Sequence, residues 1–227
     1  MLAVVYLIFN EGYVATAGDS LIRRDLCREA IRLGRLLVTL MPDEPDVYAL
    51  LALMLLHDSR RDARTRDGEL VLLEDQDRSL WDRAAIDEGL ALLDRSIRLK
   101  ASRPASVYQL QAGIAALHAQ ADSAEATDWD EIADLYTELL RIHNTPVVRL
   151  NRAVAMAMAG GPDAGLRLID EVDADLAEFH PLHAARANLL RRAGRRAEAA
   201  AAYERAIALC GNTVERRYLQ RRLAEVS

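Results

Sequence analysis

The stretch Pro181–Asn212, PLHAARANLLRRAGRRAEAAAAYERAIALCGN, decides the fold. Apolar residues recur at helical spacing on both sides of Gly194-Arg195, which predicts two amphipathic helices joined by a short turn. Small side chains stand where two packed helices must approach each other closely: Ala187, Ala199 and Ala206. The stretch therefore predicts a tightly packed helix–turn–helix unit.

This unit resembles the tetratricopeptide repeat, a helix–turn–helix of about 34 residues. A shift by that period finds the same pattern in Leu150–Val172 and relates these pairs: Gly194 to Gly160, Arg186 to Arg152, Ala187 to Ala153 and Ala199 to Gly165. Because a single unit cannot bury its apolar face, such units stack on neighbours. We predict an all-α protein of stacked antiparallel helix pairs, a tetratricopeptide-like right-handed superhelix with one irregular insertion.

The composition supports a sizeable core of small and medium side chains. The chain has 227 residues, of which 51% are hydrophobic, 28% charged and only 5% aromatic. We expect an N-terminal helical part, residues 1–100, with an irregular loop at 62–80. Tetratricopeptide-like repeats with a C-terminal capping helix are expected in residues 101–227, and both parts are expected to form one continuous domain.

Charge and cysteine usage narrow the possible partners and cofactors. The net charge of -6 disfavours direct binding of nucleic acid by this segment, because phosphates are repelled by an acidic surface. Cys27 and Cys210 lie in helical patterns without a metal-ligand spacing, so we expect buried, reduced thiols, no metal and no cofactor. The apolar run Leu2–Phe9 is too short to span a membrane and lacks the features of a signal peptide, so a cytoplasmic location is expected.

Apolar periodicity predicts the other helices of the chain. The unbroken apolar run in Leu2–Tyr13 favours a fully buried helix over a strand, and the mostly apolar Asp46–Arg61 favours a central helix. After a break at Gly18, Asp19 or Ser20 is the expected N-cap of the next helix. The further predicted helices are Leu21–Leu40, Trp81–Leu99, Pro104–Gln120, Asp128–Ile142, Pro146–Ala159, Pro162–Val172, the pair in Pro181–Leu209, and the capping helix Thr213–Val226.

Residues Asp62–Leu80 interrupt the helical pattern. Asp67-Gly68 indicates a turn, and Glu69–Leu73 is expected to be extended. A long non-helical segment within a helical stack is uncommon and often functional.

Phrases along nearly the whole chain resemble the C-terminal, tetratricopeptide-like extension of a group of extracytoplasmic-function RNA polymerase sigma factors. They are YLIFNEGY (Tyr6–Tyr13), LIRRDLCREAIRLGRLL (Leu21–Leu37), LALMLLHDSRRDAR (Leu51–Arg64), VLLEDQDRSLWD (Val71–Asp82), YQLQAGIAALHA (Tyr108–Ala119), TDW (Thr127–Trp129), PVVRLNRAVA (Pro146–Ala155) and HAARANLLRR (His183–Arg192).

The resemblance implies a non-catalytic, regulatory or protein-interaction role in transcription initiation. The implied partners are the upstream sigma-factor domains, RNA polymerase or a regulatory protein. We expect the two DNA- and polymerase-binding domains of such factors to lie outside this sequence. No promoter-reading segment precedes Leu2, and the apolar start fits a cut just after those domains.

Three groups of residues are candidates for partner binding. The first combines the acidic run near the irregular loop with residues upstream of it: His57, Arg61, Glu74, Asp75, Asp77 and Arg78. With Arg60, these side chains form either a polar pocket or an ion-pair network that pins the loop to the preceding helix. A metal or acid–base site of His57 with these carboxylates is the remaining alternative, although no ligand signature is present.

The second group is Asn10-Glu11, which either anchors its helix against the next unit or contacts an upstream domain. The third lies on the first helices of the last two repeats: Arg149, Asn151, Arg152, Arg186, Asn188, Arg191 and Arg192. In tetratricopeptide stacks those helices line the concave groove, where such side chains hold a peptide. Arg152 and Arg186 share one repeat position, which suggests structural pairing with acids instead.

The remaining histidines, His118, His143, His180 and His183, are scattered, and Pro181 argues against one continuous ligand helix. Two alternative functions stay open beside the sigma-factor interpretation. One is a free-standing scaffold that binds peptides. The other is a small-molecule sensor or an enzyme that uses His57 with Glu74–Arg78.

Overall fold

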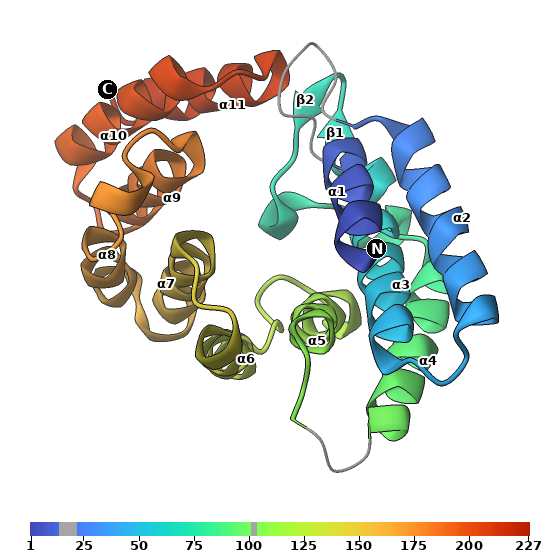
Figure 1. Cartoon of the computed structure of the whole chain (residues 1–227). Coiled ribbons are helices and arrows are strands. Elements are labelled where there is room, and N and C mark those ends of the chain that lie inside the picture. The colour runs from blue at the N-terminus through green and yellow to red at the C-terminus, as the bar shows by residue number, and fades with distance from the viewer. Residues whose placement is uncertain (14–21, 101–103) are drawn as a thin grey trace. The chain divides into compact units, whose positions relative to one another are not determined.

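The computed structural model describes residues 1–13, 22–100 and 104–227. Within these ranges the chain forms eleven α-helices, four short 3-10 helices and one small hairpin, so the predicted all-α fold is confirmed (Figure 1). The N-cap predicted at Asp19 or Ser20 lies outside the described residues. Among the residues described, no helix is both long enough and apolar enough to cross a lipid bilayer.

Contacts divide the chain into two compact units, Met1–Asp128 and Trp129–Ser227. This division lies beyond the boundary after residue 100 that the sequence suggested. The reason is that α5 (Val107–Gln120) packs against α3 (Pro45–Asp58) and α4 (Arg83–Lys100), which places it in the first unit.

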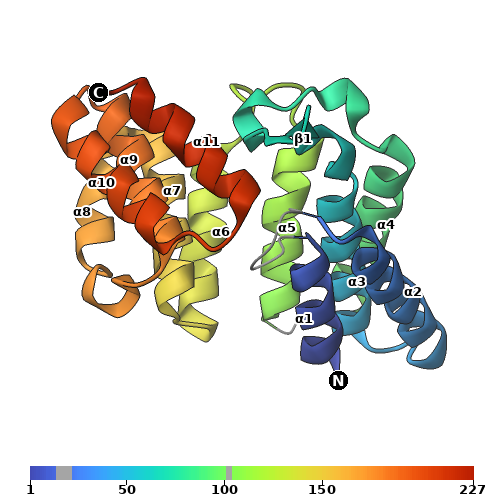
Figure 2. The ribbon, with the colours of Figure 1, turned by 90° about the horizontal axis from the view of Figure 1, so that it is seen from above.

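In the first unit, α3 lies in the middle and contacts the four other helices, α1 (Leu2–Tyr13), α2 (Arg24–Leu40), α4 and α5 (Figure 2). Every residue from Val47 to Leu56 is buried. The sequence of α3 has no polar face over these three turns, so neighbours have to cover it on all sides. The prediction of a central helix is therefore confirmed.

A buried chain of hydrogen bonds connects α5, α4 and α3. The Gln109 side-chain amide donates to Ser96 Oγ over 2.9 Å, and the Ser96 hydroxyl donates to the carbonyl of Pro45 over 2.8 Å. Gln109 also closes a capping box with Ser106 at the start of α5. Because buried polar groups need partners, this chain specifies how the three helices align.

The prediction that Leu2–Tyr13 is a fully buried helix is wrong in one respect. The helix α1 forms and buries Val5 and Phe9, but Val4 and Leu7 are 58% and 66% exposed. The reason is that α1 packs against α2 and α3 on one side, and nothing among the described residues covers its outer side chains at these positions.

The irregular insertion contains an antiparallel hairpin of β1 (Thr65–Arg66) and β2 (Glu69–Leu70). Asp67 and Gly68 form its turn with φ values of 53° and 76°. Positive φ at both turn residues matches the right-handed twist of hairpins and is typical of Asp-Gly. The predicted turn is confirmed, and two short 3-10 helices, Leu73–Asp75 and Arg78–Leu80, complete the insertion.

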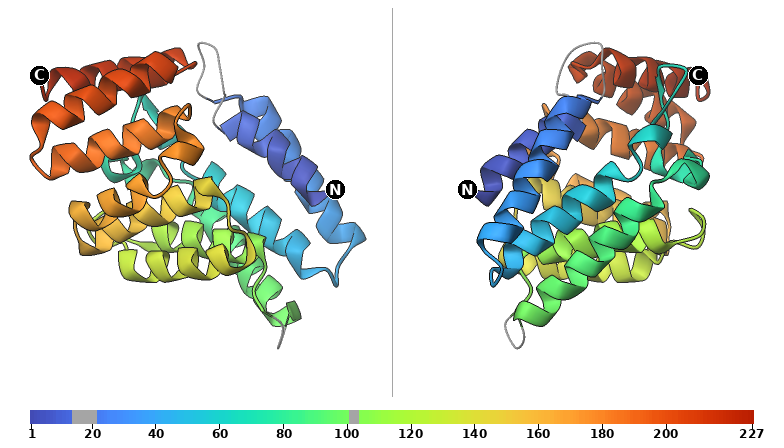
Figure 3. Two further views of the ribbon diagram at one scale, coloured as in Figure 1. Left: turned by 60° about the vertical axis from the view of Figure 1, so that its left-hand side comes forward. Right: turned by 90° about the vertical axis from the view of Figure 1, so that its right-hand side faces the viewer.

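In the second unit, each helix packs against the next one along the chain, and the views in Figure 3 show them as successive layers. Its helices are α6 (Trp129–Ile142), α7 (Pro146–Gly160), α8 (Pro162–Asp170), α9 (His180–Arg192), α10 (Arg196–Leu209) and α11 (Thr213–Ala224).

The repeat period appears directly in the helix starts. The first residues of α9 and α10, His180 and Arg196, follow those of α7 and α8 by 34 positions, from 146 to 180 and from 162 to 196. Ala187 and its counterpart Ala153 are both fully buried. The positive φ of Gly194 (75°) recurs at Gly161 (96°), one residue after the position that the period gives.

Replacing Gly165 by alanine tests the close contact of α8 with α7 and α9. A Cβ atom at this position would lie 2.6 Å from the carbonyl oxygen of Ala153 and 2.9 Å from Leu189 Cδ1. Because backbone cannot move aside as a flexible side chain can, we expect Gly165→Ala to lower the free energy of unfolding by about 1–3 kcal/mol.

Urea titration measures this loss. Gly160→Ala is the matched control, since a Cβ there meets nothing within 4 Å and φ is not positive. The control is expected to unfold at the same urea concentration as the original chain or at a slightly higher one. Equal midpoints for both variants would contradict close packing at Gly165.

Candidate functional site

A cluster of arginine, histidine and aromatic side chains surrounds the C-terminal end of α3. His57, in the last turn of α3, has its Nδ1 atom 3.2 Å from Nη2 of Arg60. The His57 ring lies 5.1 Å from the ring of Tyr13 and 6.5 Å from that of Phe9, both on α1. Residues from two helices therefore enclose the imidazole.

Arg64 extends this cluster from the start of the insertion. Its guanidinium carbon lies 3.8 Å from the centre of the Tyr13 ring, and its Nη1 donates a hydrogen bond to the Tyr13 carbonyl. The guanidinium thus binds both the face of an aromatic ring and the end of α1, where carbonyl groups attract cations.

Arg78 fixes the far end of the insertion to α5. Its Nη1 donates to the carbonyl oxygens of His118 and Ala121, over 2.8 and 2.6 Å. The same guanidinium lies 4.5 Å from the centre of the buried Trp81 ring. Carbonyls at a helix C-terminus lack partners within the helix, so Arg78 satisfies two of them. The insertion is pinned here to α5, whereas the sequence suggested the helix before it.

Burial and nearby guanidinium groups keep both histidines of this cluster neutral. Burial, followed by Arg60, Arg64 and His118, lowers the pKa of His57 well below its usual value. Burial, followed by Arg60 and Arg78, lowers the pKa of His118 from 6.5 to about 4. The positive charge of the cluster therefore comes from its arginines, and His57 is poorly placed to bind a metal cation.

Within the acidic run of the insertion, Asp77 forms short-range hydrogen bonds. Asp77 caps the second 3-10 helix, where its Oδ1 accepts hydrogen bonds from the Ser79 amide (2.9 Å) and hydroxyl (2.6 Å). These bonds lower the pKa of Asp77. Glu74 and Asp75 are exposed on the first 3-10 helix. The charged groups with the largest effects on His57 are Arg60 and Arg64, and a shared pocket of His57 with these carboxylates stays a prediction.

Arg61 forms ion pairs close to its own position in the chain. It donates to Asp58, the last residue of α3, and its Nε lies 3.9 Å from a carboxylate oxygen of Asp62. Arg24, at the start of α2, also reaches Asp62 over 2.7 Å. Ion pairs therefore exist in this region, with Asp58 and Asp62 as the acids, and ion pairing by Glu74, Asp75 and Asp77 stays a prediction.

Asn10 and Glu11, the second group of candidates for partner binding, have different surroundings. Glu11 lies 3.4 Å from Arg23 Nη1, an ion pair that ties α1 to the segment before α2. Asn10 is exposed and hydrogen-bonds to Tyr6, whose pKa burial raises to about 12. The anchoring interpretation thus applies to Glu11, and a partner contact by Asn10 stays a prediction.

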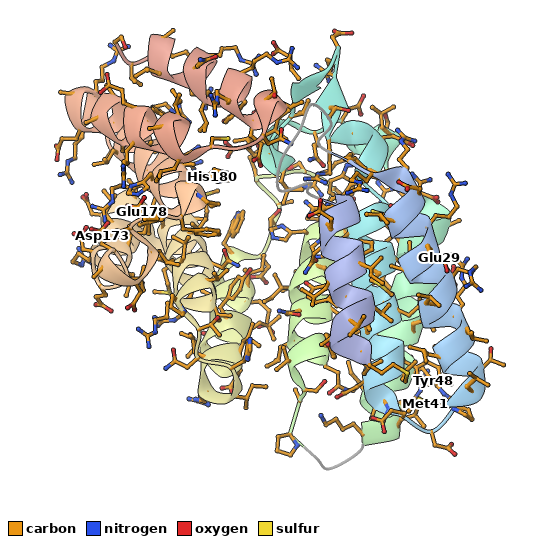
Figure 4. The ribbon with its side chains drawn as sticks, turned by 45° about the horizontal axis from the view of Figure 1, so that its top comes forward. Glu29, Met41, Tyr48, Asp173, Glu178 and His180 are labelled. Atoms are coloured by element: carbon orange, nitrogen blue, oxygen red, sulfur yellow. The ribbon has the colours of Figure 1, made fainter. Side chains whose placement is uncertain are left out.

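Arg152 and Arg186 form equivalent ties between successive helices. Arg186 donates to the carboxylates of Asp170 (2.9 Å) and Asp173 (2.8 Å), which end α8 and follow it (Figure 4 labels Asp173). Arg152 instead donates to the hydroxyl of Thr137 on α6 over 2.9 Å. The suggested pairing with acids is confirmed for Arg186, while Arg152 uses a hydroxyl group.

The other residues of α7 and α9 that were predicted to line a peptide-binding groove differ in exposure. Asn151 on α7 is exposed, whereas Asn188 and Arg191 on α9 are half-buried, and Arg191 Nε is buried without a hydrogen-bond partner. Arg149 donates to Asn144 over 2.8 Å. Arg192 is exposed. Peptide binding by Asn151, Asn188 and Arg191 stays a prediction.

The structure shows a second polar cluster, in the second unit, that the sequence analysis did not predict. His180, Cys210 and Glu215 each place one nitrogen, sulfur or oxygen atom within 4.8 Å of the other two. His180 starts α9, after the segment that carries Asp173 and Glu178 (Figure 4). His180 lies far from the other two residues along the chain, and Cys210 and Glu215 belong to different helical patterns. Their spacing in the sequence therefore does not connect them.

Comparisons with known proteins place the chain beside sequences of unknown function. Residues 1–97 match a family of unknown function, DUF6596. An uncharacterized protein of Rhizobium meliloti (strain 1021) is 48% identical over 221 residues, which cover 97% of this chain and 52% of that protein. The chain thus spans about half the length of the curated relative it matches. Since the alignment covers nearly the whole chain, both units have counterparts in the relative.

Replacing Arg78 by methionine tests how the insertion is attached. The substitution keeps an apolar stem beside Trp81 but leaves the carbonyls of His118 and Ala121 without their donor. We expect the free energy of unfolding to fall by about 1–3 kcal/mol and the insertion to become more sensitive to limited proteolysis. Arg66→Met, at an exposed position of the hairpin, is the control and is expected to change stability by less than about 0.5 kcal/mol. Equal behaviour of the two variants would contradict the attachment.

The lowered pKa of His118 predicts a pH dependence of stability. Below pH 6.5 the imidazole takes up a proton in the unfolded chain, but in the folded chain it stays neutral down to about pH 4. The unfolded state therefore binds more protons in this window, and stability falls as the pH falls through it.

Urea titrations at pH 7.5 and pH 5.5 measure this loss. We expect His118→Gln to lose less stability between the two pH values than the original chain does. His143→Gln, at an exposed position, is expected to lose as much as the original chain. If His118→Gln loses as much stability between the two pH values as His143→Gln does, then His118 does not contribute to the pH dependence.

Proposed function

We propose that this chain is a non-catalytic regulatory domain of an RNA polymerase sigma factor and acts by protein–protein interaction in the cytoplasm during transcription initiation. Its partner is the promoter-binding part of such a factor, RNA polymerase or a regulatory protein. The proposal is supported by the phrases that run from Tyr6 to Arg192, and by the stacked helices, an architecture that commonly presents binding surfaces.

The outer face of α1 is the observation that carries the proposal. Val4 and Leu7 are 58% and 66% exposed, and Asn10 continues this face toward the end of the helix. Met1, 70% exposed, adds to the apolar area. Adjacent exposed apolar side chains on a folded surface are typical of a protein-interaction site. The phrase YLIFNEGY, part of the sigma-factor resemblance, lies on this same helix.

The inner face of α1 makes this surface rigid. Val5 and Phe9 are buried against neighbouring helices, and the Phe9 ring stacks on Tyr13 with a centroid distance of 5.6 Å. Glu11 pairs with Arg23. A partner that binds the outer face therefore meets a preformed helix and loses little conformational entropy on binding.

Two further observations support a protein partner. The net charge of -6 disfavours a nucleic-acid surface. The relative from Rhizobium meliloti has almost half of its length outside the alignment, which is enough for additional helical domains. Docking of α1 on such domains is the simplest version of the proposal.

Replacing Leu7 by glutamate tests this docking. The promoter-binding domains of a sigma factor with the resembling extension are titrated with the chain in a calorimeter. We expect the original chain to bind and Leu7→Glu to bind at least about tenfold more weakly, because a charge then enters an apolar interface.

Ile97→Glu is the matched control, since Ile97 is also an exposed apolar residue of the first unit, at 56% exposure. It is expected to bind as the original chain does. Circular dichroism checks that both variants stay helical. Absence of binding by the original chain, or equal weakening in both variants, would count against α1 as the docking surface.

A further inference from the structure

Three helix ends of the second unit bring together side chains of three different chemical kinds. His180 is the first residue of α9, Cys210 follows the last residue of α10, and Glu215 lies in the first turn of α11. Cys210 is 1% exposed, and the side chains of His180 and Glu215 are 25% and 20% exposed. The cluster is therefore largely shielded from water, while parts of the His180 and Glu215 side chains stay exposed.

The distances within this cluster suit a tetrahedral ion. The Nε2 atom of His180 lies 3.3 Å from Oε2 of Glu215. Two ligands at about 2.0–2.1 Å from a tetrahedral zinc ion stand about 3.3–3.4 Å apart, so this pair already has the required separation. The Cys210 sulfur lies within 4.8 Å of both atoms, and a movement of about 1 Å brings it to a zinc–sulfur contact.

The ligand types select among metal ions. Sulfur and imidazole nitrogen suit zinc, whereas magnesium and calcium prefer oxygen ligands alone. On binding, the Cys210 thiol loses its proton to solvent and becomes a thiolate. One thiolate, one carboxylate and one neutral imidazole then balance the two positive charges of the ion, so a half-buried site carries no net charge.

Neighbouring groups hold two of the three residues in place. The Asn212 side chain accepts hydrogen bonds from the amides of Val214 (2.9 Å) and Glu215 (3.2 Å), which fixes the first turn of α11. The Cys210 thiol donates to the Asn212 carbonyl over 3.4 Å, and Arg216 donates to the Cys210 carbonyl. Such support orients ligands before the metal arrives.

We propose that His180, Cys210 and Glu215 bind one zinc ion, with the fourth position open to water or to a ligand from a partner. The ion joins the starts of α9 and α11 to the end of α10. It thereby stabilises the C-terminal helices of the second unit. This proposal does not depend on the sigma-factor role, because it rests on different residues.

Calorimetric titration of the metal-free full chain with zinc chloride tests the site. We expect one ion per chain and a higher melting temperature with zinc than without it. Cys210→Ser is expected to weaken zinc binding at least about 10- to 100-fold, the loss that removal of a supporting residue alone can cause. His180→Gln and Glu215→Gln are expected to weaken it as well, and they test the site even if the buried Cys210→Ser variant folds poorly.

Cys27→Ser and His183→Gln are the matched controls. Cys27 is the other buried cysteine, and His183 lies one turn further along α9, with Nε2 2.8 Å from the Ala177 carbonyl. Both controls are expected to bind zinc as the original chain does. A cobalt-loaded chain is expected to show thiolate-to-metal absorption that Cys210→Ser removes and that neither control changes. No binding by the original chain, or unchanged binding by all three ligand variants, would overturn the proposal.

Discussion

The first unit depends on burying a helix that has no polar side over three turns. From Val47 to Leu56, every side chain of α3 is removed from water. One or two neighbours cannot cover a cylinder of this kind, so four helices surround it. Burial of each large apolar side chain contributes about 1.5–3 kcal/mol, so the packing around α3 contributes strongly to the stability of the unit. Arg64 and the residues around His57 then position α1 against the end of α3, and Arg78 fixes the insertion to α5.

The second unit depends on the close approach of neighbouring helix backbones, whereas the first unit depends on one central helix. Fully buried Ala153 and Ala187 occupy one repeat position, and Gly165 and Ala199 occupy another. Because no large side chain separates the backbones there, each helix can lie directly on the next. Arg152 and Arg186 then connect each first helix to the helix before it. The side chains of Arg152 and Arg186 therefore have structural partners, so exposed residues of these helices are the better candidates for binding a partner.

Periodicity predicted nearly all of the helices, because their apolar residues repeat every three or four positions and proline or glycine marks their ends. The Asp67-Gly68 turn could also be predicted, since few dipeptides favour positive φ twice. The exposure of Leu7 could not be predicted, because an apolar run does not reveal how many neighbouring helices pack against a helix. In the acidic run, Asp77 binds the nearby Ser79, and charge alone does not distinguish such a short-range partner from a distant one. The cluster of His180, Cys210 and Glu215 depends on how three helix ends meet, which local sequence does not encode.

The equal spacing of the helix starts in the second unit also bears on how such a chain evolves. The helices α9 and α10 begin one full period after α7 and α8. Duplication or loss of one period therefore keeps equivalent repeat positions in contact between neighbouring helices. Removing residues 146–179 would place α9 directly after α6, where Arg186 would meet the Thr137 hydroxyl that Arg152 now binds. A stack of this kind can therefore be shortened or lengthened by one period while the contacts between successive helices keep the same pattern.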